Sequence, residues 1–372
     1  MKFICPVADL SEACQNVQRA VSGKTTIPAV EGILLRAEGE TVALTGYDLE
    51  VGIQTTIPAQ VKDEGTIIIN AKVLCDILRK LPGETVEIEA DARFLARIRS
   101  GESLYQINGM SAEEYPELPS ITGGFPLVIG QGILREMIRQ TVFAAAAVND
   151  SKPVHTGVKF EIAEKELRLV AIDGFRLAVR REVIDYSGDE IGFVVPGKTL
   201  NELVKLFGDE EAEVSIGVGK RHIVFDVGTY HMVSRLLEGE FMNYKAAIPV
   251  NHATEAAVDV RSFIAGIERI SLIITEKAKS PIRCDVLPEQ GRLQISCVTA
   301  LGTARDSVGA DISGDALEVG FNFKFLLEAL RACDTDEVRI QYNGAVSPVV
   351  ILPPEGDRYL FMVLPVRLKA DG

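Results

Sequence analysis

Several features that mark enzymes and nucleic-acid readers are missing from this sequence. It has no tryptophan for base stacking, only four histidines, and six cysteines that never form a C-x-x-C pair. The histidines show neither H-E-x-x-H nor another ligand spacing, and no G-x-S-x-G segment occurs. We therefore expect no metal, no cofactor and no catalytic residues, and we interpret the cysteines as reduced, mostly buried thiols.

Long apolar runs and a secretory leader are also missing. No stretch approaches the roughly 20 apolar residues that a membrane span needs, and Asp9 and Glu12 come too early for a signal peptide. The formal net charge of −14 argues against a protein that is basic throughout, but it permits a local basic surface. We expect a cytoplasmic protein without a membrane partner.

One stretch of the chain occurs three times. The copies span residues 67–79, 193–205 and 319–331. Lys72, Lys198 and Lys324 hold the same position in each copy, at equal steps along the chain. Each copy has the pattern of an apolar strand, a break and a helix. Because helix positions seven apart nearly superimpose, each lysine shares a face with the basic residue seven positions later, and the apolar residues occupy the opposite face.

The order of elements around each copy predicts the fold class. Each unit holds two helices and several strands, in the order strand, helix, strands, strand, helix, strands. Helices that cover one face of mostly antiparallel sheets place the chain in the α+β class. We predict three similar domains, residues 1–122, 123–250 and 251–372. In the third domain, only Arg283–Val286 and Arg292–Cys297 are predicted as strands between the first helix and the third copy.

The repeated lysines allow two interpretations. Asp76, Glu202 and Glu328 follow them by four residues, and such i,i+4 pairs on a wet helix contribute only about 0.3–0.5 kcal/mol. Three copies favour a basic surface that neutralises the phosphates of a polyanion without reading its bases. The candidate phosphate-facing residues are Lys24, Lys72, Arg79, Arg135, Arg139, Lys152, Lys198, Lys205, Lys324 and Arg331.

Two alternative functions compete with phosphate binding by the repeat. Gly192–Thr199 fits G-x-x-x-x-G-K-[ST], the pattern of a nucleotide-binding P-loop. A phosphate-cradling loop needs free backbone N–H groups, whereas this segment has strand-like Phe193–Val195 followed by Pro196, which has none. We therefore disfavour an NTPase. The second alternative is a protein scaffold that never meets DNA.

Four further segments carry a resemblance to a known family. They are Thr45–Glu50, Val170–Ala178, Phe241–Tyr244 and Met362–Leu368. Together with the threefold repeat, they resemble the bacterial DNA sliding clamp, the beta subunit of the replicative DNA polymerase. The resemblance implies a head-to-tail homodimeric ring with pseudo-sixfold symmetry, whose helices line a hole around duplex DNA. Such a ring is not an enzyme: it tethers the polymerase and makes it processive, and its other partners are the clamp loader and further proteins with a clamp-binding motif.

The resemblance also implies two protein-binding sites. Partners would insert a peptide into a cleft formed by His155, Ile172, Gly174, Phe175, Arg176, Leu177, Met242, Ala247, Val346, Pro348, Met362, Val363, Leu364, Pro365, Val366, Arg367 and Leu368. The second chain would contact Tyr105 and Ile107 in the first domain, and Leu272 and Ile273 in the third. Two features depart from the family pattern: Phe175 replaces a common histidine, and Lys369–Gly372 extend past the usual end.

Overall fold

The computed structural model describes residues 1–23, 25–121, 125–150, 152–275 and 280–368. The chain forms two compact units, and each is described here by itself. Unit 1 comprises Met1–Leu134 and Lys198–Leu236, and unit 2 comprises Arg135–Gly197 and Leu237–Gly372. Residues of the second predicted domain therefore contribute to both units.

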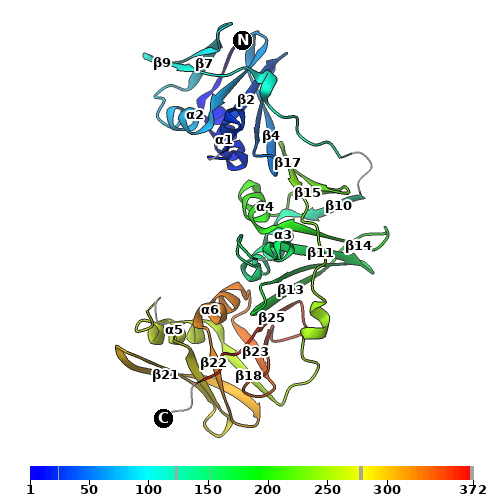
Figure 1. The fold of residues 1–372 in the computed structure, drawn as a ribbon, viewed down its shortest axis with the longest axis vertical. Helices are drawn as coiled ribbons and strands as arrows, with labels where there is room; N and C mark the ends of the chain where they lie inside the picture. Colours follow the sequence, from blue (N-terminus) through cyan, green and yellow to red (C-terminus); the bar gives the residue numbers. More distant parts are fainter. Residues whose placement is uncertain (24, 122–124, 151, 276–279, 369–372) are drawn as a thin grey trace. The chain divides into compact units, whose positions relative to one another are not determined.

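Six α-helices occur in the described residues (Figure 1). Their bounds are α1 (Val7–Val17), α2 (Ala71–Leu78), α3 (Gln131–Arg139), α4 (Gly197–Leu203), α5 (Val260–Ser271) and α6 (Phe323–Ala332). None of the helices in the described part of the chain combines the length and apolar character that crossing a bilayer requires.

Unit 1 contains two antiparallel sheets. Its strands are β1 (Lys2–Pro6), β2 (Gly32–Glu38), β3 (Thr41–Tyr47), β4 (Val51–Pro58), β5 (Gln60–Asp63), β6 (Gly65–Asn70), β7 (Thr85–Ala90), β8 (Leu95–Ser100), β9 (Ser103–Asn108), β10 (Phe125–Gly130), β15 (Glu213–Val218), β16 (His222–Val227) and β17 (Tyr230–Arg235). One sheet has the order β5-β1-β7-β8-β9, and the other has the order β10-β15-β16-β17-β4-β3-β2-β6. Helices α1 and α2 contact each other and pack on this strand framework.

Unit 2 is built on one 12-stranded antiparallel sheet. Its strands are β11 (Gly157–Ala163), β12 (Glu166–Ile172), β13 (Arg176–Val183), β14 (Ile191–Pro196), β18 (Thr254–Asp259), β19 (Ile282–Leu287), β20 (Arg292–Thr299), β21 (Gly302–Gly314), β22 (Leu317–Phe321), β23 (Glu337–Tyr342), β24 (Val349–Leu352) and β25 (Tyr359–Val363). The order is β14-β11-β12-β13-β25-β24-β23-β18-β21-β20-β19-β22. Helices α5 and α6 lie against each other, and α5 contacts β20 and β21.

The repeated stretch forms a strand and a helix in all three copies, as predicted. Asparagine stands at the junction of strand and helix in two of them, and its side chain caps the helix. Asn70 Oδ1 accepts a hydrogen bond from Val73 N at 3.1 Å, and Asn322 Oδ1 accepts one from Lys324 N at 3.1 Å. Each cap satisfies a backbone N–H that the first turn of a helix leaves without a partner.

The strand and helix predictions were wrong in three places. Strand β21 was missed because its sequence alternates small and polar residues and half-exposes its side chains, so it lacks a strong apolar period. Strand β5 was missed because it is a short, solvent-exposed edge strand. The apolar positions Ile133, Met137, Ile138, Val142 and Phe143 predict one continuous helix. However, α3 ends at Arg139, and Val142–Ala144 form a separate 3-10 turn.

Candidate nucleic-acid surface and partner cleft

In unit 1, helix α2 has one apolar face and one basic face. Leu74 and Leu78 are buried, whereas Lys72 and Arg79 are exposed. The guanidinium of Arg79 lies 3.2 Å from the Asp76 carboxylate. Among the described residues, Lys72 has no ion-pair partner, so its charge is available to an external anion.

Helix α4 and the 3-10 turn Val204–Leu206 that follows it carry the equivalent lysine pair of the second copy. Lys198 Nζ lies 3.0 Å from Asp48 Oδ2, and Lys205 Nζ lies 2.8 Å from Glu202 Oε1. Arg19, just after α1, reaches Glu202 at 3.4 Å and thereby ties the end of α1 to α4. Helices α2, α1 and α4 thus form a connected series within unit 1.

In unit 2, hydrogen bonds and ion pairs connect the corresponding helices. Arg139 at the end of α3 donates to the carbonyl oxygen of Arg331 on α6 at 3.2 Å. Arg331 in turn lies 2.6 Å from Glu268 on α5. Exposed Lys324 also stands on α6, and exposed Lys152 precedes the 3-10 turn Pro153–Thr156.

In the first two copies of the repeat, the acidic residue does not pair with the lysine four positions before it. Asp76 and Glu202 bind the basic residue three positions later, and Glu328 binds Arg176. The interpretation of the lysines as i,i+4 partners is therefore wrong for Lys72 and Lys198.

Two predicted phosphate-facing positions remain, Arg135 and Lys24. Arg135 lies on α3 and is half-buried. Lys24 lies outside the described residues. Apart from Lys152, the placed members stand in helices or in the turns that end them, and contacts or ion pairs join neighbouring helices within each unit. A row of basic helix faces can neutralise phosphates without reading base edges.

The P-loop interpretation of Gly192–Thr199 does not fit the structure. Residues 191–196 pair along their whole length with β11, so their backbone groups belong to a sheet. Thr199 is fully buried, and its hydroxyl hydrogen-bonds to Ser234 Oγ at 2.8 Å. The extended strand cannot converge its backbone N–H groups on an anion as a phosphate loop does, and the hydroxyl that such a loop would use is engaged. In the described residues, no group of three or more His, Cys, Asp or Glu side chains could hold a metal ion.

The predicted partner cleft lies entirely within unit 2, around the junction of β13 and β25. Leu177 pairs with Met362, and Arg176 pairs with Val363. An apolar cluster, here called the Leu177 cluster, contains Val170, Ile172, Leu177, Val179, Tyr244, Val350, Leu352, Leu360 and Met362. Ala247 packs against it, together with Phe241 and Ile248. The structure thus brings together Ile172, Leu177, Met362 and Ala247, four residues predicted for the cleft.

The other predicted cleft residues surround this cluster or are more exposed. His155 contacts the Phe241 ring, with ring centroids 5.5 Å apart. Burial, followed by the nearby charge of Lys152, lowers the pKa of His155 below its usual value. Met242 is 44% exposed and Val346 is 73% exposed, so both are accessible to a ligand. Pro348 is half-buried, next to β24, and Arg367 is exposed.

A tight turn presents Phe175 at the cleft. Asp173 Oδ1 accepts hydrogen bonds from the backbone N–H groups of Phe175 and Arg176, at 2.9 and 3.0 Å. Gly174, between Asp173 and Phe175, has φ +86°, a conformation that glycine adopts at little cost. The Phe175 side chain is consequently 61% exposed.

Arg176 is held by charge on one side and aromatic rings on the other. Its side chain is 10% exposed and forms ion pairs with Asp173 and Glu328. Its guanidinium lies 4.5 Å from the Phe325 ring centroid and 5.6 Å from that of Phe143. The Phe325 ring also stacks on Phe175 at 6.0 Å. Sequence reasoning missed Phe143, Phe325 and Glu328, although Phe325 and Glu328 stand in the third copy of the repeat.

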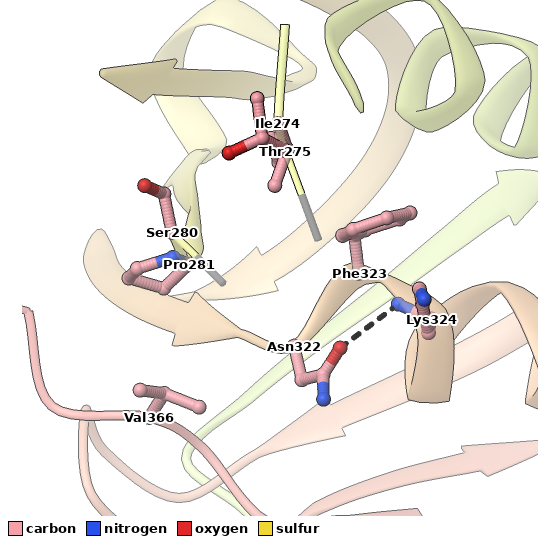
Figure 2. A pocket seen from close by; sticks show the side chains of 8 residues that line it. All are labelled: Ile274, Thr275, Ser280, Pro281, Asn322, Phe323, Lys324 and Val366. Carbon is pink, nitrogen blue, oxygen red and sulfur yellow. Dashed lines mark hydrogen bonds between the residues drawn. The ribbon is translucent and has the colours of Figure 1, made fainter. Parts of the chain in front are cut away.

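The C-terminal segment borders a second hollow. Ile274, Thr275, Ser280, Pro281, Asn322, Phe323, Lys324 and Val366 line a cavity of about 530 Å³ (Figure 2). Of the predicted cleft residues, Val366 alone is among these lining residues. Val366 therefore faces an open space on the side of the α6 N-terminus.

The residues predicted for contact with a second chain lie at open edges. Tyr105 and Ile107 belong to β9, the last strand of its sheet, where Leu104 and Tyr105 are 49% and 37% exposed. In unit 2, Leu272 directly follows α5 and is 83% exposed, whereas Ile273 is half-buried. An unpaired strand edge and an exposed leucine are both suited to contact with another chain.

Comparison with known proteins covers nearly the whole chain. Models of the N-terminal, central and C-terminal domains of the DNA polymerase III beta subunit match residues 1–119, 128–243 and 245–367. The beta sliding clamps of Halalkalibacterium halodurans and Bacillus subtilis are 36% and 33% identical, over 99% of this chain and 100% of each relative.

Solved structures give the same result. A crystal structure of the Bacillus subtilis DNA polymerase sliding clamp is 33% identical, with a TM-score of 0.95 over 99% of this chain and 100% of that chain. A Pseudomonas aeruginosa sliding clamp bound to griselimycin is 28% identical, with a TM-score of 0.93 over the same shares. The three matched domains, the α+β architecture and the full-length identity lead to one conclusion: the chain belongs to the DNA polymerase III beta subunit family, the bacterial DNA sliding clamps.

Proposed function

We propose that two copies of this chain close head to tail into a ring with pseudo-sixfold symmetry that encircles duplex DNA. Each copy contributes three domains, residues 1–122, 123–250 and 251–372. The ring slides along DNA in the cytoplasm and tethers the replicative polymerase, and it has no active site of its own. The observation that supports this proposal most strongly is the basic face of the repeated helix, which recurs on α2, α4 and α6.

The strength of the expected DNA contacts suits sliding. Most of the basic residues are exposed and carry flexible side chains, and several are already engaged with carboxylates. Their contacts with phosphates would be individually weak, screened by salt and independent of sequence. The closed ring around the duplex keeps the protein on DNA instead. By tethering the polymerase, the ring raises the local concentration of polymerase at the DNA without any base contact.

Ring closure requires two unlike surfaces that meet twice. The β9 edge with Tyr105 and Ile107 would face the region of Leu272 and Ile273 in the other copy. Head-to-tail pairing of such patches closes a dimer when the rotation between copies is half a turn. Within the described part of the chain, residues 302–308 of β21 pair only with β20. This edge of β21 lies in the same third domain and could accept β9 as an added strand.

The cleft around the Leu177 cluster is proposed to bind a short peptide of the polymerase, the clamp loader or another partner. An apolar floor with a methionine can adapt to different side chains, and Arg176 and Arg367 offer hydrogen bonds to polar groups. We further propose that griselimycin, which the Pseudomonas aeruginosa relative binds, occupies the same cleft in this chain. Griselimycin is therefore a practical probe of the cleft.

Electron cryomicroscopy of the chain with a short DNA duplex tests the proposal. The expected result is a two-chain ring with Lys72, Lys198 and Lys324 of both copies turned toward the duplex. An assembly with these lysines on its outer surface, or DNA bound outside a ring, would refute it. Calorimetric titration with griselimycin tests the cleft separately, since Leu177→Asp should abolish binding there.

A further inference from the structure

The residues after β25 are held against the sheet of unit 2 by two backbone hydrogen bonds. Leu364 N–H donates to the Phe175 carbonyl oxygen at 2.8 Å, and Val366 N–H donates to the Gly320 carbonyl oxygen at 2.8 Å. The two donors are two residues apart, because alternate residues of an extended segment point their N–H groups to the same side. Pro365, between them, has no N–H to leave unpaired. We call Leu364–Leu368 the C-terminal strap.

Gly320 lies where the strap approaches closest to β22. A Cβ atom at this position would lie 2.3 Å from the Val366 carbonyl oxygen, and 2.8 and 2.9 Å from two side-chain carbons of Leu368. All three of these nearest atoms belong to the strap. A contact of 2.3 Å with a backbone oxygen cannot be relieved by rotating a side chain, so the strap itself would have to move.

The backbone conformation gives no other reason for glycine at this position. Gly320 does not have a positive φ, and it pairs in regular antiparallel register with Arg283 on β19. In a strand, glycine is less stable than alanine by roughly 0.5–1 kcal/mol. Glycine costs stability at this position, and the three atoms nearest to its absent Cβ all belong to the strap, so close approach of the strap explains the glycine.

From this geometry we infer that Gly320 is a positioning residue for the partner cleft: its missing side chain seats the C-terminal strap. The inference rests on the proposed role of the cleft. The strap supplies five of the residues predicted for that cleft, and its Val366 also lines the cavity next to Asn322 and Lys324 (Figure 2). Because the Leu364 N–H is hydrogen-bonded to the Phe175 carbonyl oxygen, a shift of the strap also moves the exposed Phe175 ring at the edge of the cleft.

Gly320→Ala in the full-length chain is the direct test, and Gly192→Ala is its matched control. Gly192 also lies in an edge strand, β14, and a Cβ there would meet its nearest atoms at 3.8 Å, an ordinary contact. Hydrogen exchange of the strap amides is the first readout. Gly320→Ala should speed exchange at Leu364 and Val366 by about tenfold, the effect of losing one net hydrogen bond, and leave β19 protected. Gly192→Ala should change neither.

Griselimycin affinity, measured by calorimetry, is the second readout. We expect Gly320→Ala to weaken binding about fivefold to tenfold, which corresponds to roughly one hydrogen bond, and Gly192→Ala to bind as the wild type does. In a chain that stops after Val363, where β25 ends, adding Gly320→Ala should cause no further loss.

The two readouts separate the inference from the proposed function. Unchanged strap exchange in Gly320→Ala would overturn the positioning role, whatever the affinity. Faster strap exchange with unchanged griselimycin affinity would overturn the link between strap and cleft. Failure of the wild type to bind griselimycin would instead refute the cleft assignment, while the exchange data still decide whether Gly320 seats the strap.

Discussion

Neutralising the three repeated lysines should weaken the salt-dependent attraction to DNA without unfolding the protein. The change is Lys72→Ala, Lys198→Ala and Lys324→Ala in one chain. Each phosphate contact that is lost should reduce the slope of log affinity against log salt by about 0.9. In the proposed ring each lysine occurs twice, so the reduction should be at most about 5, reached only when all copies contact phosphates together.

The single variants should differ because the lysines have different surroundings. Lys72 has no ion-pair partner among the described residues, whereas Lys198 must leave Asp48, 3.0 Å away, to reach a phosphate. A partly exposed pair of this kind is worth up to about 1 kcal/mol, which is about fivefold in affinity. Lys72→Ala should therefore reduce DNA affinity more than Lys198→Ala, by up to that factor.

Fluorescence anisotropy with a labelled duplex, repeated over a series of salt concentrations, measures these slopes. The control removes three exposed lysines that lie on strands or turns: Lys62→Ala, Lys165→Ala and Lys220→Ala. Both triple variants remove the same net charge, so a general charge effect would reduce their slopes equally. Equal slopes, or a larger effect of the control, would refute the assignment of the helix faces to DNA.

Three further predictions concern the cleft and the dimer. The pKa of His155 is lowered by burial, so the folded protein should lose stability as pH falls from about 6.5 through that lowered pKa. The melting temperature should therefore fall less between pH 7.5 and pH 5 in His155→Gln than in the control His252→Gln, whose imidazole is exposed. Arg176→Ala should lower the free energy of unfolding in urea by about 2–4 kcal/mol, because it leaves the largely buried Asp173 carboxylate without its partner; an effect below about 0.5 kcal/mol, the range of ordinary surface substitutions, would contradict this account. Leu272→Asp should shift sedimentation from dimer toward monomer, whereas Val183→Asp, at an equally exposed strand position, should not; an unchanged dimer would remove Leu272 from the interface.

The repeat made much of the fold predictable from sequence. Because Leu74, Leu200 and Leu326 recur at equal steps with a basic residue on the opposite face, both the helices and their buried sides followed from periodicity. Strand β21 could not be found in this way. Its backbone pairs with β20 at one end and β18 at the other, and that support comes from tertiary contacts and not from its own pattern.

The arrangement of the residues proposed for the cleft was predictable only in part. Its apolar floor, such as Leu177 and Met362, came from the family resemblance and is brought together in the structure. The arrangement around Arg176 depended on which aromatic and acidic residues of α6 and of the turn after α3 approach it in space. Contacts between residues so far apart in sequence have no local signature. The role of Gly320 was likewise invisible, because it depends on the path of the strap.

A retention experiment tests most directly whether DNA passes through a closed ring. The protein is loaded by its clamp loader onto a nicked circular plasmid, and the complex is separated from free protein by gel filtration in high salt. Half of the sample is then cut once with a restriction enzyme and filtered again. The account predicts that the protein stays on the circle and leaves the linear DNA. Equal retention on both forms, or loss from both, would contradict it.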